Sequence, residues 1–80
     1  MSDTLARLQE VFIDAFDDDD LAITRDTTAA DVEGWDSLMH VTLMLQVEGA
    51  FGIRMTSAEV TGLKNVGQLV DIIEKKRGGA

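Results

Sequence analysis

Residues 34–40 read Gly34-Trp35-Asp36-Ser37-Leu38-Met39-His40 (GWDSLMH), and they mark the point where a long polar segment passes into an apolar run. Asp36 is a good helix N-cap, because its side-chain oxygen accepts a hydrogen bond from a free backbone amide of the first turn. The apolar run continues to Phe51, and Gly52 then suits the left-handed position that ends many helices. This stretch therefore predicts a helix over residues 37–51, with Ser37 as its first residue.

The predicted helix over residues 37–51 carries apolar side chains at helical spacing, which indicates a face buried in a core. We expect this inward face to comprise Leu43, Val47, Ala50 and Phe51, with Val41 and Leu45 beside it. Gly49 lies inside the same helix, where glycine costs about 0.5–1 kcal/mol relative to alanine.

Three further helices follow from the same kind of pattern. The first begins near residue 3 and ends at the aspartates 17–20, which are poor helix formers and repel one another. The third is short, because Thr56 and Glu59 form a capping box at its start and Gly62 lies only about two turns later. The last starts near Asn65. The apolar residues predicted to face the core in the first and last helices are Leu5, Leu8, Phe12, Ala15, Val66, Leu69, Val70 and Ile73.

A long polar connection over residues 17–36 joins the first two helices. Leu21, Ile23 and Val32 are expected to hold it against the core, and Thr28 with Asp31 predicts a single helical turn within it. A connection of this length inside a small domain is uncommon and often functional. The pattern as a whole predicts an all-α, four-helix bundle with three longer helices, one short third helix and a long loop between the first two.

Composition restricts the function. Eighty residues make a single domain, residues 1–80, and the chain has no cysteine for disulfides or thiolate zinc sites. A lone His40 cannot build a histidine metal cluster, and no apolar run is long enough to insert into a membrane. Residues 1–40 have a net charge of −9 and residues 41–80 of +1. Such acidity opposes nucleic-acid binding. We expect a complete, stand-alone monomer in the cytoplasm.

Two candidate sites fail on their spacing. A calcium-binding EF-hand loop beginning at Asp17 needs an oxygen ligand and a glycine at its fifth and sixth positions, which are Leu21 and Ala22 here. Ser37 and His40 lie one turn apart, as in a hydrolase dyad. Nucleophilic catalysis also needs an oriented base and an oxyanion hole, however, and nothing in the sequence supplies them. We therefore expect no metal site and no catalytic residue, and a partly exposed His40.

Ser37 itself has two interpretations. It is either an inert first-turn serine behind an Asp36 cap or an attachment point for a phosphate-linked group, since the amino end of a helix favours a phosphate.

The chain resembles the acyl carrier protein family along nearly its whole length. The resemblance rests on Trp35-Asp36-Ser37-Leu38 followed by Glu48, Phe51-Gly52-Ile53 and the spacing of the last helix. Further residues that match the family's spacing are Val41, Leu43, Leu45, Val47, Met55, Glu59, Leu63, Val66, Leu69 and Ile73.

The resemblance implies a function without catalysis. Ser37 would carry 4′-phosphopantetheine, transferred from coenzyme A by a phosphopantetheinyl transferase with magnesium, and acyl groups would be held on its thiol as thioesters. Partner enzymes would load and process those groups. Asp36 would cap the helix beside the attachment point, and the residues expected to contact partners are Leu38, Met39, Thr42 and Glu48. A core lined by Leu43, Val47, Phe51, Leu63 and Ile73 would shelter an acyl chain if it opened.

The chain also departs from the bacterial fatty-acid carriers, which have acids along the second helix. Met39 and Thr42 occupy such positions here, and Gly49 follows Glu48. The form Gly-Trp-Asp-Ser-Leu is closer to discrete carriers of polyketide and other specialised acyl pathways, while fatty-acid-like biosynthesis stays open. The alternatives are an aminoacyl carrier of D-alanyl or peptidyl type, and an unmodified helical interaction module.

Overall fold

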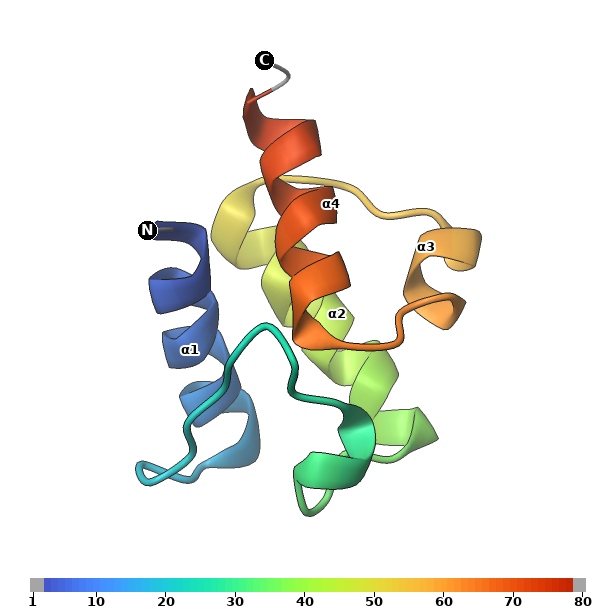
Figure 1. Cartoon of the computed structure of the whole chain (residues 1–80). Helices are drawn as coiled ribbons and strands as arrows, with labels where there is room; N and C mark the ends of the chain where they lie inside the picture. The colour runs from blue at the N-terminus through green and yellow to red at the C-terminus, as the bar shows by residue number, and fades with distance from the viewer. Residues whose placement is uncertain (1–2, 79–80) are drawn as a thin grey trace.

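The computed structural model describes residues 3–78, and within them the chain forms helices only. In chain order these are α1 (Asp3–Phe16), the 3₁₀ turn η1 (Ala29–Asp31), α2 (Ser37–Phe51), α3 (Ser57–Thr61) and α4 (Val66–Gly78). Helices α1, α2 and α4 lie side by side, and the short α3 lies on the far side of α2 and α4 from α1 (Figure 1). The predicted all-α bundle with one short third helix is confirmed.

The ends of α2 are set by the residues that the sequence indicated. The Asp36 carboxylate accepts a hydrogen bond from the Met39 amide at 2.8 Å. Gly52 adopts φ 66°, and the Glu48 carbonyl accepts hydrogen bonds from the Gly52 and Ile53 amides, as at a helix end capped by a left-handed glycine. Local chemistry therefore determines where α2 begins and ends.

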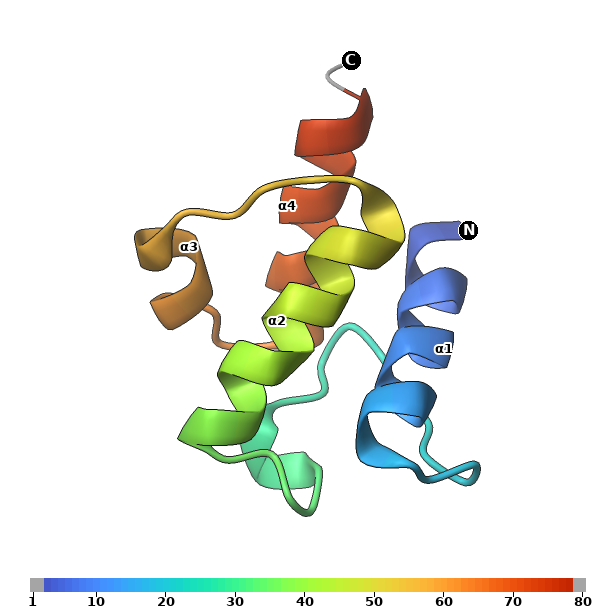
Figure 2. The same cartoon turned by 180° about the vertical axis from the view of Figure 1, so that it is seen from behind.

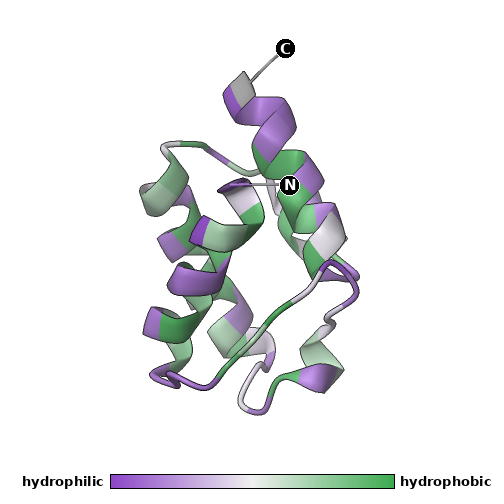
Figure 3. Ribbon diagram, turned by 60° about the vertical axis from the view of Figure 1, so that its left-hand side comes forward, coloured by the Kyte–Doolittle hydropathy of each residue, from purple (hydrophilic) through white to green (hydrophobic). Residues whose placement is uncertain are grey.

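The core lies between α1, α2 and α4 and includes two residues of the long connection. Figure 3 shows the hydrophilic residues concentrated in the turn after α1 and in the last turns of α4. The buried apolar side chains are Leu8, Phe12, Ile23, Val32, Leu43, Met44, Val47, Phe51, Ile53, Val66, Leu69, Val70 and Ile73. Most of the predicted core is confirmed, although Leu5, Ala15, Ala50 and Leu63 are only partly buried.

The expectation that Val41 and Leu45 lie beside the buried face of α2 is wrong. Their side chains are 54% and 63% exposed, and Met44 takes the inward position instead. Each lies two residues from Leu43, which at 3.6 residues per turn places it on nearly the opposite side of the helix. Helix α2 thus carries a second apolar face that points to solvent.

The long connection is hydrogen-bonded to α1 on one side and to the start of α4 on the other. The Gln9 side chain in α1 donates to the Leu21 carbonyl and accepts from the Ile23 amide. At the start of α4, the Val66 and Gly67 amides donate to the carbonyls of residues 27 and 25, both at 2.8 Å. These bonds satisfy amides that the first turn of a helix cannot pair internally. The connection is therefore an ordered part of the fold.

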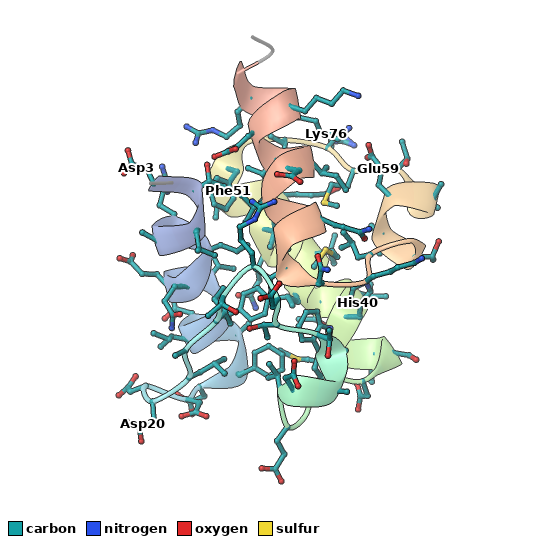
Figure 4. The ribbon with its side chains drawn as sticks, in the orientation of Figure 1. Asp3, Asp20, His40, Phe51, Glu59 and Lys76 are labelled. Atoms are coloured by element: carbon teal, nitrogen blue, oxygen red, sulfur yellow. The ribbon has the colours of Figure 1, made fainter. Side chains whose placement is uncertain are left out.

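The far end of α2 is surrounded by cations. The guanidinium groups of Arg7 and Arg77 lie 5.3 and 5.6 Å from the centroid of the Phe51 ring, and Arg7 also donates to the Ala50 carbonyl at 3.0 Å. Cations suit the negative end of a helix dipole. In Figure 4, Lys76 lies near this end of the molecule and Asp20 at the opposite one.

Candidate functional site at the start of α2

Ser37 is the first residue of α2, and this helix starts at the lower end of the bundle, beside η1 (Figure 2). Its side chain is exposed, and its hydroxyl makes no hydrogen bond to any residue between 3 and 78. The serine thus combines an accessible oxygen with the positive end of a 15-residue helix.

The turn that presents Ser37 is held from both sides by Asp36. Its carboxylate accepts from the Met39 amide and its carbonyl from the His40 amide, each at 2.8 Å. These bonds fix the backbone on either side of the serine, and the predicted capping role of Asp36 is confirmed. The serine hydroxyl is left free while its backbone is rigid.

His40 connects this turn to α3. The Trp35 indole nitrogen donates to Nδ1 of His40 at 2.9 Å, and Nε2 lies 2.8 Å from the Val60 carbonyl oxygen. An indole nitrogen only donates, so Nδ1 accepts and the ring proton sits on Nε2, where it is donated to Val60. Because both ring nitrogens are engaged, neither is free to act as a base for Ser37. A Ser37–His40 dyad is therefore excluded by geometry.

Trp35 is itself anchored in the core. Its ring meets Phe12 edge-on at a centroid distance of 5.2 Å, and Phe16 lies at 6.2 Å. Aromatic pairs in such arrangements contribute about 0.5–1.5 kcal/mol beyond the area that they bury. A continuous set of contacts consequently runs from α1 through Trp35 and His40 to α3.

A surface hollow of about 660 Å³ adjoins Ser37 between η1, α2 and α3. Its walls include Trp35, Ser37, His40, Val41, Val60 and Thr61. The serine hydroxyl thus borders a mostly apolar recess with a few polar groups at its edge, which is the usual make-up of a site for an organic group.

The residues expected to contact partners differ in exposure. Leu38 is 79% exposed and Thr42 is also exposed, but Met39 and Glu48 are half-buried. The Glu48 carboxylate accepts a hydrogen bond from the Met55 amide at 2.7 Å, so it braces the segment before α3. Sequence reasoning missed this brace and also missed Val41 and Leu45, which extend the exposed apolar face that begins at Leu38.

Helix α3 is stabilised by its capping box and by one ion pair. Glu59 accepts from the Thr56 amide at 2.9 Å and lies 3.0 Å from the Lys76 ammonium in α4. The pKa of the Glu59 carboxyl lies below its ordinary value. The main cause is the hydrogen bond from the Thr56 amide, and the second is the hydrogen bond with Lys76. Since α3 has only five residues, these contacts do much to keep it in place.

Other sites are not supported within residues 3–78. No group of three histidine or acidic side chains is arranged to hold a metal ion, and Asp17–Asp20 are simply exposed. None of the helices described is both long and apolar enough to cross a membrane.

Comparison with known proteins places this geometry in a family. Residues 6–73 match the family described as "Phosphopantetheine attachment site". The acyl carrier protein of Phenylobacterium zucineum is 31% identical over 78 residues, which span 98% of this chain and 99% of that protein. The acyl carrier protein of Thermotoga maritima is 35% identical over 60 residues, covering 75% and 74% of the two chains.

A solved structure agrees with the fold. The solution structure of a holo acyl carrier protein from Geobacter metallireducens superposes with a TM-score of 0.90 at 40% sequence identity. The match covers 98% of this chain and 90% of that one.

Proposed function

Because this chain belongs to the acyl carrier protein family, we propose that Ser37 is the residue that bears its phosphopantetheine. The family's members are carriers without enzymatic activity, and this chain is likewise a carrier of phosphopantetheine-linked acyl groups. When bound, the group supplies a thiol that forms thioesters, and the described chain has no cysteine of its own to do so.

The observation that carries the assignment is the free hydroxyl of Ser37 at the start of α2. Its backbone is held by Asp36, while the oxygen itself has no competing partner in the described chain. The amides of the first helical turn and the helix dipole favour an anion at this position, which suits a phosphodiester. The other exposed serine that begins a helix, Ser57, starts a helix of only five residues.

The neighbouring hollow fits the rest of the group. It reaches from Ser37 along Val41 to Val60 and Thr61, so an extended chain leaving the serine would meet apolar side chains with a hydroxyl at the edge. The residues present are therefore compatible with phosphopantetheine in both its charged and its uncharged parts.

The exposed apolar face of α2 is the proposed docking surface for a phosphopantetheinyl transferase and for acyl-loading and acyl-processing enzymes. Leu38, Val41 and Leu45 lie on one side of the helix directly after Ser37, with Thr42 among them. An enzyme that acts at Ser37 would meet these exposed side chains close to the serine. We propose that the protein works as a cytoplasmic monomer.

The pathway proposed is a specialised one of polyketide-like type. Glu48 is the only acid in α2, and its carboxylate is engaged by the Met55 amide. The exposed side of α2 therefore offers apolar contacts in place of acidic ones, which favours partners whose docking surfaces are apolar too.

The attachment site is tested by intact mass. The protein is incubated with coenzyme A, magnesium and a broad-specificity phosphopantetheinyl transferase, and we expect the gain of one phosphopantetheine group. Ser37→Ala should abolish the gain. Ser57→Ala is the matched control, because Ser57 is also exposed and first in its helix, and it should keep the gain. An unmodified wild type beside an active transferase, or a modified Ser37→Ala, would overturn the proposal.

A further inference from the structure

His40 makes the one side-chain hydrogen bond that joins α2 directly to α3 within the described chain. Its ring lies between the Trp35 indole, which precedes the serine turn, and the Val60 carbonyl near the end of α3. The remaining polar anchors of this region act elsewhere, through the Glu59–Lys76 pair and through the Met55 amide on Glu48. The end of α3 that borders the Ser37 hollow is thus held by His40.

Two cavities meet at this histidine. The hollow beside Ser37 and a smaller cavity of about 50 Å³ share Ala29, Trp35, His40 and Leu63 in their walls. The smaller cavity is also lined by Lys64 and Asn65 and by Leu69 of α4, a core residue that is only 1% exposed. The hydrogen-bonded ring is therefore part of the wall between the hollow at Ser37 and a cavity that reaches the core residue Leu69.

We propose that His40 is a gate residue, which in its doubly hydrogen-bonded form closes the passage from the Ser37 hollow to the core. Release of its bonds to Trp35 and Val60 frees the end of α3 and joins the two cavities. This inference rests on the proposed attachment at Ser37, because the gate then controls whether an acyl chain carried there lies outside or against Leu69. With the gate closed, the chain remains in the outer hollow, available to partner enzymes.

The chemistry of the ring suits this role. Val41, Val60 and Leu63 give the passage apolar walls, whereas the Trp35–His40–Val60 bonds are the polar contacts that must open. A single hydrogen bond contributes only modestly to stability, so two of them form a closure that thermal motion can open. A glutamine at this position offers one acceptor and one donor on a planar group and should replace the ring, whereas alanine should not.

The first experiment compares acyl forms of the full-length protein. Wild type, His40→Ala and His40→Gln are loaded at Ser37 with acetyl or octanoyl groups, confirmed by intact mass, and the methyl resonances of Leu63 and Leu69 are recorded. We expect octanoyl loading to shift the Leu69 methyls in His40→Ala and to leave them unmoved in wild type and His40→Gln. The acetyl forms, which carry almost no apolar chain, should show no shift in any variant.

Either of two results would overturn the gate. One is a Leu69 shift in wild type as large as in His40→Ala, and the other is no shift in His40→Ala. If His40→Ala fails to fold, Trp35→Phe replaces it, because this variant keeps an aromatic ring but removes the indole donor to Nδ1. It should also allow the octanoyl-dependent shift, and its failure to do so counts equally against the gate.

A second measurement needs no attached group. In the unmodified protein, His40→Ala should speed hydrogen exchange at the Val60 and Gly62 amides roughly five- to tenfold, the size expected for the loss of one hydrogen bond. The Gly67 amide, bonded to the Arg25 carbonyl, should be unchanged. Gln46→Ala, an exposed change elsewhere on α2, is the control variant. Unaltered exchange at Val60 and Gly62 overturns the gate even if Ser37 proves unmodified, so the two proposals fail separately.

Discussion

Gly67 and Arg25 touch through their backbones: the Gly67 amide donates to the Arg25 carbonyl at 2.8 Å, and a Cβ on Gly67 would lie 2.9 Å from that oxygen. The contact joins the first turn of α4 to the long connection, 42 positions earlier in the chain by residue number. Only a residue without a side chain permits this approach, so Gly67 is needed for space and its φ is unremarkable.

Gly67→Ala is expected to lower the free energy of unfolding by about 1–3 kcal/mol, because the new methyl group forces the backbone of the connection away. Gly49→Ala is the opposite case. Nothing lies within 4 Å of a Cβ there, and alanine is the better helix former by about 0.5–1 kcal/mol. Urea unfolding of both variants checks the pair, and a Gly67→Ala protein as stable as wild type would contradict the close contact.

Gln9→Ala should destabilise the protein by about 1–3 kcal/mol, since it leaves the Leu21 carbonyl and the Ile23 amide, both part-buried, without their partner. Gln46→Ala removes an exposed glutamine with no such bonds and should stay within about 0.5 kcal/mol of wild type. Denaturant unfolding gives both values, and hydrogen exchange at Ile23 should quicken only in Gln9→Ala. If the two substitutions destabilised the protein equally, the hydrogen bonds of Gln9 to Leu21 and Ile23 would contribute no stability of their own.

Asp36→Ala removes the cap of α2 and should cost about 0.5–2 kcal/mol. Asp36→Asn retains an oxygen that accepts from the Met39 amide and should restore most of the stability. Thermal unfolding followed by circular dichroism distinguishes the two. If asparagine and alanine are equally destabilising, the charge of Asp36 matters more than its hydrogen bond.

The stability contributed by Glu59 should depend on pH. Its pKa in the folded protein lies below the ordinary value of about 4.3, because the carboxylate is bonded to the Thr56 amide and paired with Lys76. A lowered pKa stabilises the fold above the unfolded-state pKa, and this stabilisation is lost as pH falls through the folded-state pKa. Glu59→Gln should therefore be less stable than wild type at pH 7, and the difference should shrink as the pH falls below the unfolded-state pKa toward 3. A difference that persists unchanged at pH 3 would rule out the charge as its source.

The exposed apolar face of α2 predicts a transferase interaction that depends little on salt. Leu38→Ala and Leu45→Ala should raise the transferase KM several-fold with little change in stability, because these side chains are 79% and 63% exposed. Wild-type KM should change little between low and physiological salt, since apolar contacts are not screened. Steady-state modification assays measure both effects, with Gln46→Ala as control. A steep rise of KM with salt would indicate acidic docking instead.

The elements most faithfully predicted from sequence are those set by residues within one or two helical turns. The Asp36 cap, the Thr56–Glu59 capping box and the end of α2 at Gly52 all form as expected. Each involves partners five or fewer positions apart, whose geometry follows from the helix itself. The position of Ser37 at the exposed start of a helix could be predicted for the same reason.

The wrong expectation that Val41 and Leu45 lie beside the buried face of α2 also has a physical cause. Apolar residues occur on two sides of this helix, and composition alone does not reveal which side meets α1 and α4. Met44 is 3% exposed and Leu45 63% exposed, although they are neighbours of similar hydrophobicity. Packing assigns one side to the core, and the other becomes the proposed docking surface.

By itself, the sequence predicted a small helical bundle with a serine behind an aspartate cap and a resemblance to a carrier family, because helix signals and the family's motif are local. Tertiary structure alone decided that Gln9 holds residues 21–23, that Gly67 meets Arg25, and that His40 joins Trp35 to Val60. These contacts bring together segments up to 42 positions apart, and their partners are chosen by how the helices pack around a shared core.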